Sequence, residues 1–517
     1  MQLNLIVPVT DGEKQVGDEE IHGRLWRMTG PHDIETPGNL EFHCVSYVWG
    51  SGIEKIGSFF DCKRDISDQT RPALAAAIKA AAAAASQDET HAPLVEVFWI
   101  DAICIPQLET PERYRTLERQ VKQKSCIVMG WIYSAALSVL IVLQHPIWRI
   151  IESVSAVEKK SPRVLSYDEM QIVEKDKWIS RVWTYQELVN GYPVFFTTLE
   201  PTISGHAIGS GKFFNCVGFS LDTWKRASGK GYIAVLETFH NLDTLQDTLA
   251  DLQLGNYLDR TAFGILSNMA LRTFVPAFAQ NRLLASLGAL SKDTSWGPPS
   301  TTLAELAEKL MSICESKGDF SFIYTSDVRD TSPGLGWRPS PSQLAADEPM
   351  NLVPVANWST WGTQNGHRDL KGLWLDEMVH LKPADKIDDE VENVLQKIMY
   401  GSPALEQSEK QSDAVNDGIF PHKKSGEEEL SSGLLRFLRK IGFKGHGEPQ
   451  VCKQGLFFSQ LGLESCEPVQ IYVSSSLRWT FGSPGLATWK ESGESRYCAG
   501  VFTGIPKTEV PQSVLLG

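Results

Sequence analysis

The chain of 517 residues has a formal net charge of -14 at pH 7, and 42% of its residues are hydrophobic while 22% are charged. This composition predicts a soluble globular protein of two or three structural units and excludes disordered, fibrous and membrane-embedded chains. The acidic charge argues against general binding of nucleic acid or of an anionic membrane, because phosphate groups attract basic surfaces. We therefore expect neither nucleic acid nor a membrane among the partners.

The cysteines and the amino-terminal residues indicate the cellular compartment of the protein. Nine cysteines without a C-x-x-C pair indicate reduced thiols in a cytoplasmic protein. Residues 1–10 lack the basic lead and the small-residue cleavage site of a secretory signal. The apolar stretch at 135–143 is about half as long as the ~20 residues that a spanning helix needs. We expect a cytoplasmic location and no transmembrane segment.

Strands and helices alternate through the first 200 residues. In chain order, the sequence predicts a strand at 42–49, a helix at 70–85, a strand at 95–101, a helix at 112–136, a strand at 137–143, a helix at 181–190 and a strand at 193–198. This alternation predicts an α/β fold with a parallel sheet flanked by helices. Ligands of such sheets bind at the carboxyl ends of the strands.

The pattern changes after residue 235. The clearest helix there begins at a capping box formed by Thr302 and Glu305. Near the carboxyl terminus, apolar runs separated by Gly, Pro and Ser predict antiparallel strands at 469–473, 477–481 and 497–502. The regions that we expect are a domain at 1–235 with its core at 40–200, a mainly helical region at 236–402, a flexible linker or insert at 403–431 and a small α+β unit at 432–517.

Familiar catalytic motifs are missing or incomplete. Gly211 and Lys212 resemble part of a phosphate-binding loop, but His206 stands where its first glycine should be and Phe213 replaces its hydroxyl residue. The histidines lack the spacing of a zinc site, and the sequence contains no G-x-S-x-G motif. We therefore expect no metal and no bound cofactor.

Polar residues gather where the predicted strands end, and the carboxyl ends of parallel strands lie at one edge of a sheet. These positions predict a single polar rim. Its members are Ser46, Tyr47, Trp49 and Gly50 after the first strand, Asp101, Cys104 and Gln107 after the second, and Arg181, Gln186 and Glu187 in an aromatic segment after the third.

Four sequence blocks carry a family resemblance. They are Ser46–Gly50 (SYVWG), Trp99–Gln107 (WIDAICIPQ), Ile132–Tyr133 with Ala135, and Arg181–Glu187 (RVWTYQE). In this order and spacing they resemble the fungal heterokaryon-incompatibility (HET) domain over roughly residues 21–200. A later segment, Asn281–Gly288, resembles a stretch that often follows this domain. The resemblance implies a cytoplasmic role in allorecognition, in which the HET domain triggers programmed cell death.

The chain departs from the family pattern in the second block. Pro106 stands where the family usually has Asn, which removes a side-chain amide and a backbone donor from the rim. The segment between Gln107 and Tyr133 is also longer than in the shorter family members. Pro106 puts in doubt whether this loop binds a ligand in the family's usual way.

HET domains are similar to Toll/interleukin-receptor (TIR) domains, so the resemblance implies a TIR-like fold. NAD-cleaving TIR domains place a glutamate within a W-x-x-x-E-L block, which Trp183–Leu188 matches. The match makes Glu187 the candidate catalytic carboxylate and NAD a candidate substrate, because a carboxylate can stabilise the oxocarbenium-like ribose left by nicotinamide. Trp49 or Tyr47 would stack on a base. The substrate-binding residues that we expect are Ser46, Tyr47, Trp49, Gly50, Asp101, Gln107, Arg181, Trp183 and Gln186.

Structural interpretations of the same residues stay open. Glu187 is either a catalytic carboxylate or an ordinary helix residue paired with Arg181. Asp101 either contacts a ligand or caps the following turn. Cys104 is expected to be a packed thiol, because no neighbouring histidine would activate it. The aromatic residues expected in the core are Trp99, Trp131 and Trp183.

Two functions from different classes also stay open. One is an NAD glycohydrolase that uses Glu187, and the other is a non-catalytic interaction module or scaffold that recruits death-pathway partners. The enzyme predicts an open rim that Glu187 faces, whereas the module predicts a filled rim and an exposed patch elsewhere. The partners implied are a homo-oligomer or other HET and death-pathway proteins.

Overall fold

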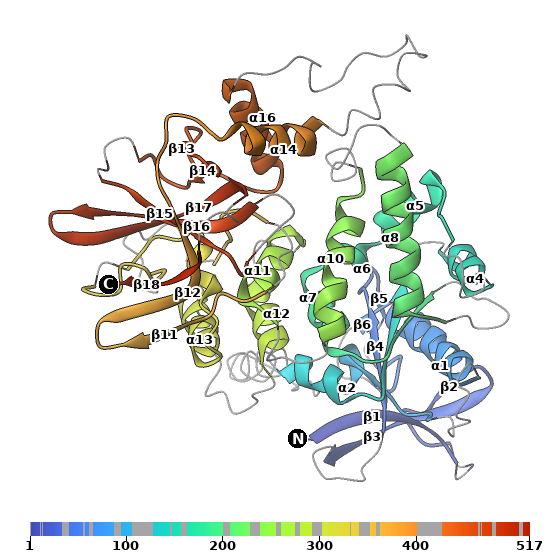
Figure 1. Ribbon diagram of the computed structural model, residues 1–517. Coiled ribbons are helices and arrows are strands. Elements are labelled where there is room, and N and C mark those ends of the chain that lie inside the picture. The colour runs from blue at the N-terminus through green and yellow to red at the C-terminus, as the bar shows by residue number, and fades with distance from the viewer. Residues whose placement is uncertain are drawn as a thin grey trace, which may run out of the picture.

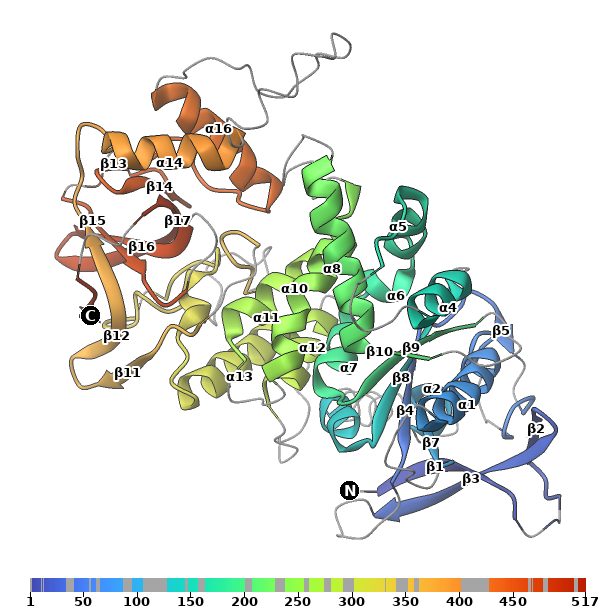
Figure 2. The same cartoon turned by 45° about the vertical axis from the view of Figure 1, so that its right-hand side comes forward.

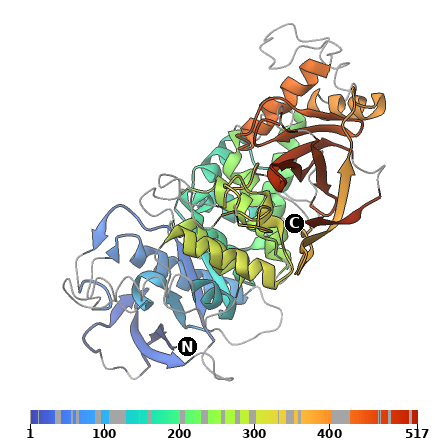
Figure 3. The same ribbon diagram turned by 90° about the vertical axis from the view of Figure 1, so that its left-hand side faces the viewer.

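The structure is a computed structural model in which three groups of elements follow one another along the chain (Figure 1). A mixed α/β domain leads into a group of helices and then into an antiparallel β domain, and Figure 3 shows the helices between the two sheets. The residues that the structure describes are 2–10, 12, 14–33, 41–54, 57–61, 66–86, 95–105, 128–144, 147–156, 163–199, 207–227, 238–254, 260–273, 280–291, 302–330, 332–340, 352–357, 362–400, 427–463, 466, 468–477, 482–505 and 510–517.

The first domain contains an eight-stranded sheet with the strand order β10-β9-β8-β4-β7-β1-β3-β2. The strands β9, β8, β4 and β7 are parallel, and those at both edges are antiparallel. The strands are β1 (Gln2–Pro8), β2 (Glu19–Ile21), β3 (Arg24–Asp33), β4 (His43–Tyr47), β7 (Phe98–Ile100), β8 (Ser138–Leu143), β9 (Val194–Thr198) and β10 (Ile208–Gly209), with a separate pair β5 (Ile53–Glu54) and β6 (Ile66–Ser67).

The wholly parallel sheet expected from the sequence is therefore wrong at its edges. A two-residue turn, in which His22 has a φ of 53° and Gly23 a φ of 74°, joins β2 to β3. Such a turn connects antiparallel neighbours, whereas parallel strands need a long crossover. The mildly apolar sequence of residues 2–8 does not indicate which strands pair with it, because strand pairing depends on distant segments. β1 pairs antiparallel with both β3 and β7.

The predicted elements of the parallel part are largely confirmed. The predicted helix at 70–85 is α1 (Thr70–Ser86), and strands β8 and β9 lie where they are expected. The predicted strand at 95–101 is shorter, because Asp101 already begins the short helix α2 (Asp101–Cys104). Residues 128–135 are helical, and the rest of the helix predicted at 112–136 lies mostly outside the described residues.

Helices cover both faces of the central strands, and every residue of β4 and β8 is buried. Tyr47 contacts α1 on one face, and Ser46 contacts α6 (Lys177–Ser180) and α7 (Val182–Asn190) on the other. Figure 2 shows α1 on one side of the strands β4 and β8 and α7 on the other. The remaining helices near this sheet are α4 (Trp148–Ala156), α5 (Tyr167–Glu174), α8 (Ser210–Ala227) and α10 (His240–Leu254).

Helix α7 belongs to two hydrophobic cores. Leu188 packs in the core of the first sheet, whereas Val182, Tyr185 and Val189 pack in a second core that extends into the carboxyl-terminal sheet. The second core also includes helices α11 (Ala262–Leu271), α12 (Gln280–Leu290) and α13 (Leu303–Ser316) and the 3-10 helix η2 (Ser321–Tyr324). The capping box predicted at Thr302 and Glu305 is confirmed at the start of α13.

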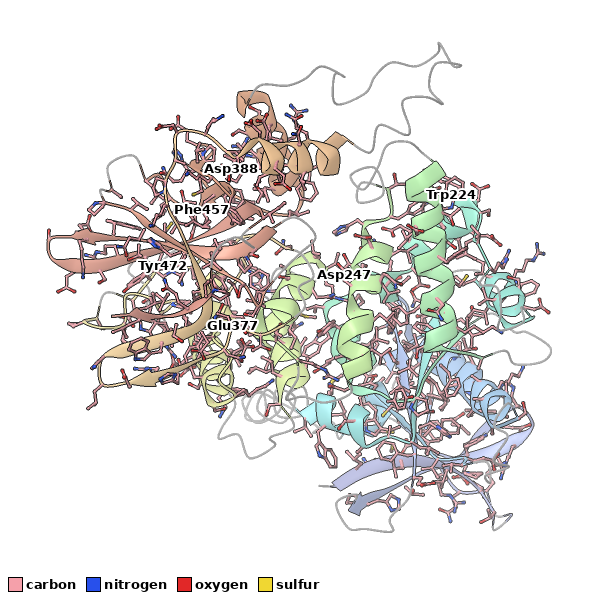
Figure 4. The ribbon with its side chains drawn as sticks, in the orientation of Figure 1. Trp224, Asp247, Glu377, Asp388, Phe457 and Tyr472 are labelled. Carbon is pink, nitrogen blue, oxygen red and sulfur yellow. The ribbon has the colours of Figure 1, made fainter. Side chains whose placement is uncertain are left out.

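The carboxyl-terminal β part is larger than the small unit expected, because β11 (Gly366–Asp369) and β12 (Gly372–Leu381) lie in the region expected to be mainly helical. A bulge at Glu377, which Figure 4 labels and whose φ is 54°, interrupts the two-residue alternation of β12 and so hides the strand in the sequence. The sheet order is β11-β12-β15-β16-β17-β14-β13, and β18 also pairs with β12. The other strands are β13 (Gln450–Cys452), β14 (Gly455–Ser459), β15 (Gln470–Ser474), β16 (Gly482–Glu491), β17 (Glu494–Gly504) and β18 (Gln512–Leu516).

Two helices flank this sheet, α14 (Asp389–Tyr400) and α16 (Glu427–Lys440). Helix α16 begins inside the linker predicted at 403–431, and residues 403–426 lie outside the described residues. Of the three predicted strands, 469–473 corresponds to β15 and 497–502 lies within β17, while most of 477–481 lies outside the described residues.

None of the described helices is long and apolar enough to cross a membrane. Within the same residues, no group of three or more His, Cys, Asp and Glu side chains is placed to hold a metal ion.

Candidate functional site

The candidate site is built around a hydrogen bond between β4 and α7. Ser46 lies next to the last residue of β4, and its hydroxyl donates to Glu187 Oε2 at 2.5 Å. Both side chains are buried, with exposed fractions of 1% for Ser46 and 6% for Glu187. The structure thus brings two of the predicted rim residues, 141 positions apart in sequence, into direct contact at the carboxyl end of the parallel strands.

A tryptophan holds Ser46 in place from the other side. Trp178 Nε1 donates to Ser46 Oγ at 2.7 Å. The Ser46 hydroxyl therefore accepts a hydrogen bond from Trp178 and donates one to Glu187. Trp178 is fixed by the N-cap of α6, where Asp176 Oδ1 accepts from the Trp178 backbone N–H at 2.8 Å. The other Asp176 oxygen, Oδ2, accepts from the backbone N–H of Gln144, just after β8, at 2.7 Å.

Sequence reasoning missed Trp178 and Asp176 as parts of the site. Trp178 begins the aromatic segment that contains Glu187, but an aromatic residue there is more often core packing. The available signal was Asp176, two residues before Trp178, because Asp before a short helical segment is a frequent N-cap. Nothing in the sequence pairs Trp178 with Ser46, because their partnership depends on how α6 docks on β4.

The carboxyl of Glu187 has an unusual protonation equilibrium. Burial raises the pKa of Glu187 to about 7, because the charged form loses solvation, and the negative charge of Asp101 acts in the same direction. The Ser46 hydrogen bond and the charges of Arg181 and Arg272 lower this pKa and so oppose the rise. Near neutral pH the carboxyl therefore exchanges between its neutral and charged forms.

Asp101 and Trp49 meet at the same edge. Trp49 Nε1 donates to Asp101 Oδ1 at 3.4 Å, and the indole keeps an exposed fraction of 39%. Asp101 Oδ1 also accepts from the backbone N–H of Ala102 at 2.7 Å, which is the local turn contact expected from its structural interpretation. Asp101 thus stabilises the start of α2 and, through the same oxygen, orients the Trp49 indole.

Tyr47 and Gly50 do not join Glu187. Tyr47 lies on the opposite face of β4, because successive strand residues alternate, and its hydroxyl is 2.7 Å from Thr70 Oγ1 of α1. Gly50 donates its backbone N–H to Ser67 Oγ at 2.7 Å. A Cβ atom at Gly50 would lie 2.2 Å from Asp68 Oδ1, so a larger residue there would force the Asp68 side chain to shift. Both residues have a structural role in forming this edge.

The predicted residues around Glu187 on its own segment divide between two sides of α7. Arg181 is the N-cap residue and contributes positive charge to the site. Trp183 is half-buried against the second core. Gln186 is fully buried and faces α12, where a Cβ atom at Gly288 would lie 1.9 Å from Gln186 Oε1.

The remaining predictions concern the loop after β7. Gln107, like Pro106, lies outside the described residues. Cys104 is buried, and its sulfur accepts from the backbone N–H of Ile100 at 3.5 Å, in agreement with a packed thiol. Trp99 is fully buried and makes an edge-to-face contact with Tyr133, with the ring centroids 5.7 Å apart.

The comparisons with known proteins concern the part of the chain that holds this site. A family model described as heterokaryon incompatibility protein (HET) matches residues 42–187, from the residue before β4 to Glu187. No curated protein and no solved structure matches the chain. The resemblance carried by the four sequence blocks is thereby confirmed for this segment.

Proposed function

Since residues 42–187 form a HET domain, we propose that the protein acts in heterokaryon incompatibility and cell death by hydrolysing NAD, with Glu187 as the catalytic carboxylate. The family match supports the cell-death role, and the geometry around Glu187 supports the chemistry. A TIR-like fold, an origin in a fungus and a cytoplasmic location belong to the same proposal.

The proposed reaction breaks the bond between the ribose C1′ and the nicotinamide nitrogen. The pyridinium ring leaves with the bonding electron pair as neutral nicotinamide, so the leaving group needs no proton. The ribose becomes oxocarbenium-like, and an ionised carboxylate stabilises this positive charge. A water molecule then adds to C1′ and releases a proton, which gives ADP-ribose.

The observation that carries the proposal is the state of Glu187. One of its oxygens, Oε2, is oriented by Ser46, whereas Oε1 accepts no hydrogen bond from the described residues. A carboxyl that is buried at the carboxyl end of parallel strands and has a pKa of about 7 is typical of an active site rather than of a surface helix. Oε1 is the atom left for a ligand.

The test is release of nicotinamide from NAD by the purified full chain. Glu187→Gln keeps the shape and can still accept from Ser46, but it lacks the charge, so turnover should fall about 100-fold or more. Glu174→Gln is the matched control, because Glu174 is a second carboxyl whose pKa burial raises to about 7, and it bonds to the backbone N–H groups of Asn241 and Leu242 in α10. The control should keep turnover within about two-fold of wild type, since Glu174 bonds to α10 and is not among the groups that act most strongly on Glu187.

A non-catalytic interaction module is the second candidate, and the buried hydrogen bonds that Ser46 makes to two helices favour it. Ser46, Trp178 and Glu187 together join β4, α6 and α7, which is also what a structural cluster would do. Wild-type protein that releases no nicotinamide, at high concentration and with a crowding agent, would support the module. In that case the Glu187→Gln chain should retain whatever self-association the wild type shows in light scattering.

A further inference from the structure

Arg272 enters the HET domain from the helical region that follows it. It is the C-cap residue of α11, and its side chain is buried, with the residue 3% exposed. Arg272 Nη1 lies 3.1 Å from the carbonyl oxygen of Ile179, 3.2 Å from that of Arg181 and 3.2 Å from Thr184 Oγ1. These three acceptors surround the joint between α6 and α7. Arg272 Nε is fixed on its own helix by Asn268 Oδ1 at 2.6 Å.

The backbone at the joint between α6 and α7 also forms hydrogen bonds with the residue after Arg272. Thr273 donates its backbone N–H to the Ser180 carbonyl at 2.7 Å, and its own carbonyl accepts from the Val182 N–H at 3.1 Å. Thr184 Oγ1, which Arg272 contacts, is 2.6 Å from the carbonyl oxygen of Trp178. The end of α11 therefore fixes the segment that carries Trp178 on one side and Glu187 on the other.

The charge of Arg272 has no contact ion pair among the described residues, and its Nη2 is a buried nitrogen without a hydrogen-bond partner there. Burial lowers the pKa of the Arg272 guanidinium to about 10, while Tyr185 and the Glu187 carboxylate act in the opposite direction, so Arg272 is charged at neutral pH. The guanidinium lies over the Tyr185 ring, 5.4 Å from its centroid. The other groups that act on Glu187 are Arg181 and, with the opposite sign, Asp101. The pKa values of the Cys44 thiol and the Tyr133 hydroxyl are raised by burial, so both are neutral near pH 7.

We propose that Arg272 is a positioning residue of the Glu187 site, so that the site of the HET domain is complete only when α11 is docked against α6 and α7. This proposal rests on the proposed function only in treating Glu187 as the catalytic carboxylate. Arg272 acts in two ways: its fork of donors fixes the α6–α7 joint, and its charge favours the ionised form of Glu187.

The first experiment measures the ionisation of Glu187 without using NAD turnover. In pH-difference infrared spectra of the full chain, the C=O band of the protonated Glu187 carboxyl is the band that Glu187→Gln removes. Arg272→Gln should raise the midpoint of this titration by roughly one pH unit, because a nearby positive charge is lost. Arg272→Lys, which keeps the charge, should return the midpoint to the wild-type value.

The matched control is Arg260→Gln. Arg260 is another buried arginine of the same region, and its Nη1 donates to Asn190 Oδ1 at 2.5 Å and to the Ala289 carbonyl at 3.1 Å. It is not among the charges that act most strongly on Glu187. Arg260→Gln should destabilise the chain without moving the Glu187 midpoint. An unchanged midpoint in a folded Arg272→Gln chain, or an equal rise in Arg260→Gln, would overturn the proposal.

A second measurement tests the positioning role with Arg272→Lys, so it can be made even if Arg272→Gln does not fold. Lysine cannot reproduce the fork of Arg272, so Arg272→Lys should speed amide hydrogen exchange in the peptide that covers residues 177–184, as measured by mass spectrometry. Arg260→Lys should instead speed exchange at the carboxyl ends of α7 and α12, where the arginine binds the Val189 and Ala289 carbonyls. Unchanged protection of residues 177–184 in Arg272→Lys would contradict the positioning role. Because neither readout uses NAD, a wild type without turnover would leave both results interpretable.

Discussion

The burial of Glu187 lowers the free energy of unfolding by an amount that depends on pH. Its folded-state pKa of about 7 lies above the ordinary value of 4.5, so the folded chain keeps a proton that the unfolded chain has lost between these two values. Folded stability therefore falls as the pH rises from about 4.5 to about 7, and the loss from this group levels off above that at about 3 kcal/mol.

Glu187→Gln removes this cost, because glutamine is neutral at every pH and still accepts from Ser46. We expect the variant to be more stable than wild type by up to about 3 kcal/mol at pH 8 and by only about 1 kcal/mol at pH 5. Urea unfolding of both chains at the two pH values measures the difference. A variant that is less stable than wild type at pH 8 would show that the charged carboxylate contributes to the fold.

The same carboxyl predicts the pH dependence of the proposed reaction. Stabilisation of a positive ribose requires the ionised form, so nicotinamide release should rise with pH and reach half of its plateau near pH 7. Initial rates from pH 5.5 to pH 8.5 at saturating NAD measure this profile. A rate that falls with rising pH through the same range would mean that Glu187 acts as an acid.

Helices cross closely beside the site because two glycines allow it. A Cβ atom at Gly130, in the helical residues 128–135, would lie 2.0 Å from the backbone carbonyl oxygen of Gly288 on α12. A Cβ atom at Gly288 would instead meet the Gln186 side chain of α7. A backbone atom cannot move aside as a side-chain end can, so Gly130 is the more restricted position.

Gly130→Ala should therefore lower the free energy of unfolding by about 2 kcal/mol or more, since the added methyl forces the helices apart. The control is Gly211→Ala on α8, where no atom lies within 4 Å of the added Cβ. This control should be neutral or should stabilise the chain by up to about 1 kcal/mol through helix propensity. Urea unfolding of the three chains compares them, and equal stability of the two variants would refute the close crossing.

At the scale of the whole molecule, the HET domain and the region after it share a helix. The family match ends at Glu187, but α7 continues to Asn190 and places Val182, Tyr185 and Val189 in the second core. The boundary at residue 235 that the sequence predicts would cut this core, because α11, α12 and α13 all lie beyond it.

A chain truncated after residue 235 should expose the apolar side of α7. We expect it to aggregate or to melt at least about 10 °C below the full chain, because three buried apolar side chains would lose their partners. Differential scanning fluorimetry and binding of a hydrophobic dye measure both effects. A truncated chain as stable as the full one would show that the HET domain folds independently of the second core.

Local signals in the sequence determined several elements of the fold. Pro72 and the alanines of α1, the continuous apolar run of β8 and the capping box at Thr302 depend on neighbouring residues alone, so they predict their elements correctly. The sequence also led to Glu187 and Ser46, because each belongs to a recognisable block.

Only the tertiary structure decided which of these residues meet. Gln186 and Glu187 are adjacent in sequence but point to different sides of α7, one toward α12 and the other toward Ser46. The edge strand β1 and the bulged strand β12 find their partners far along the chain. Arg272 reaches the site from 85 positions after Glu187. Contacts of this kind depend on how whole elements pack, and no local pattern of residues encodes that packing.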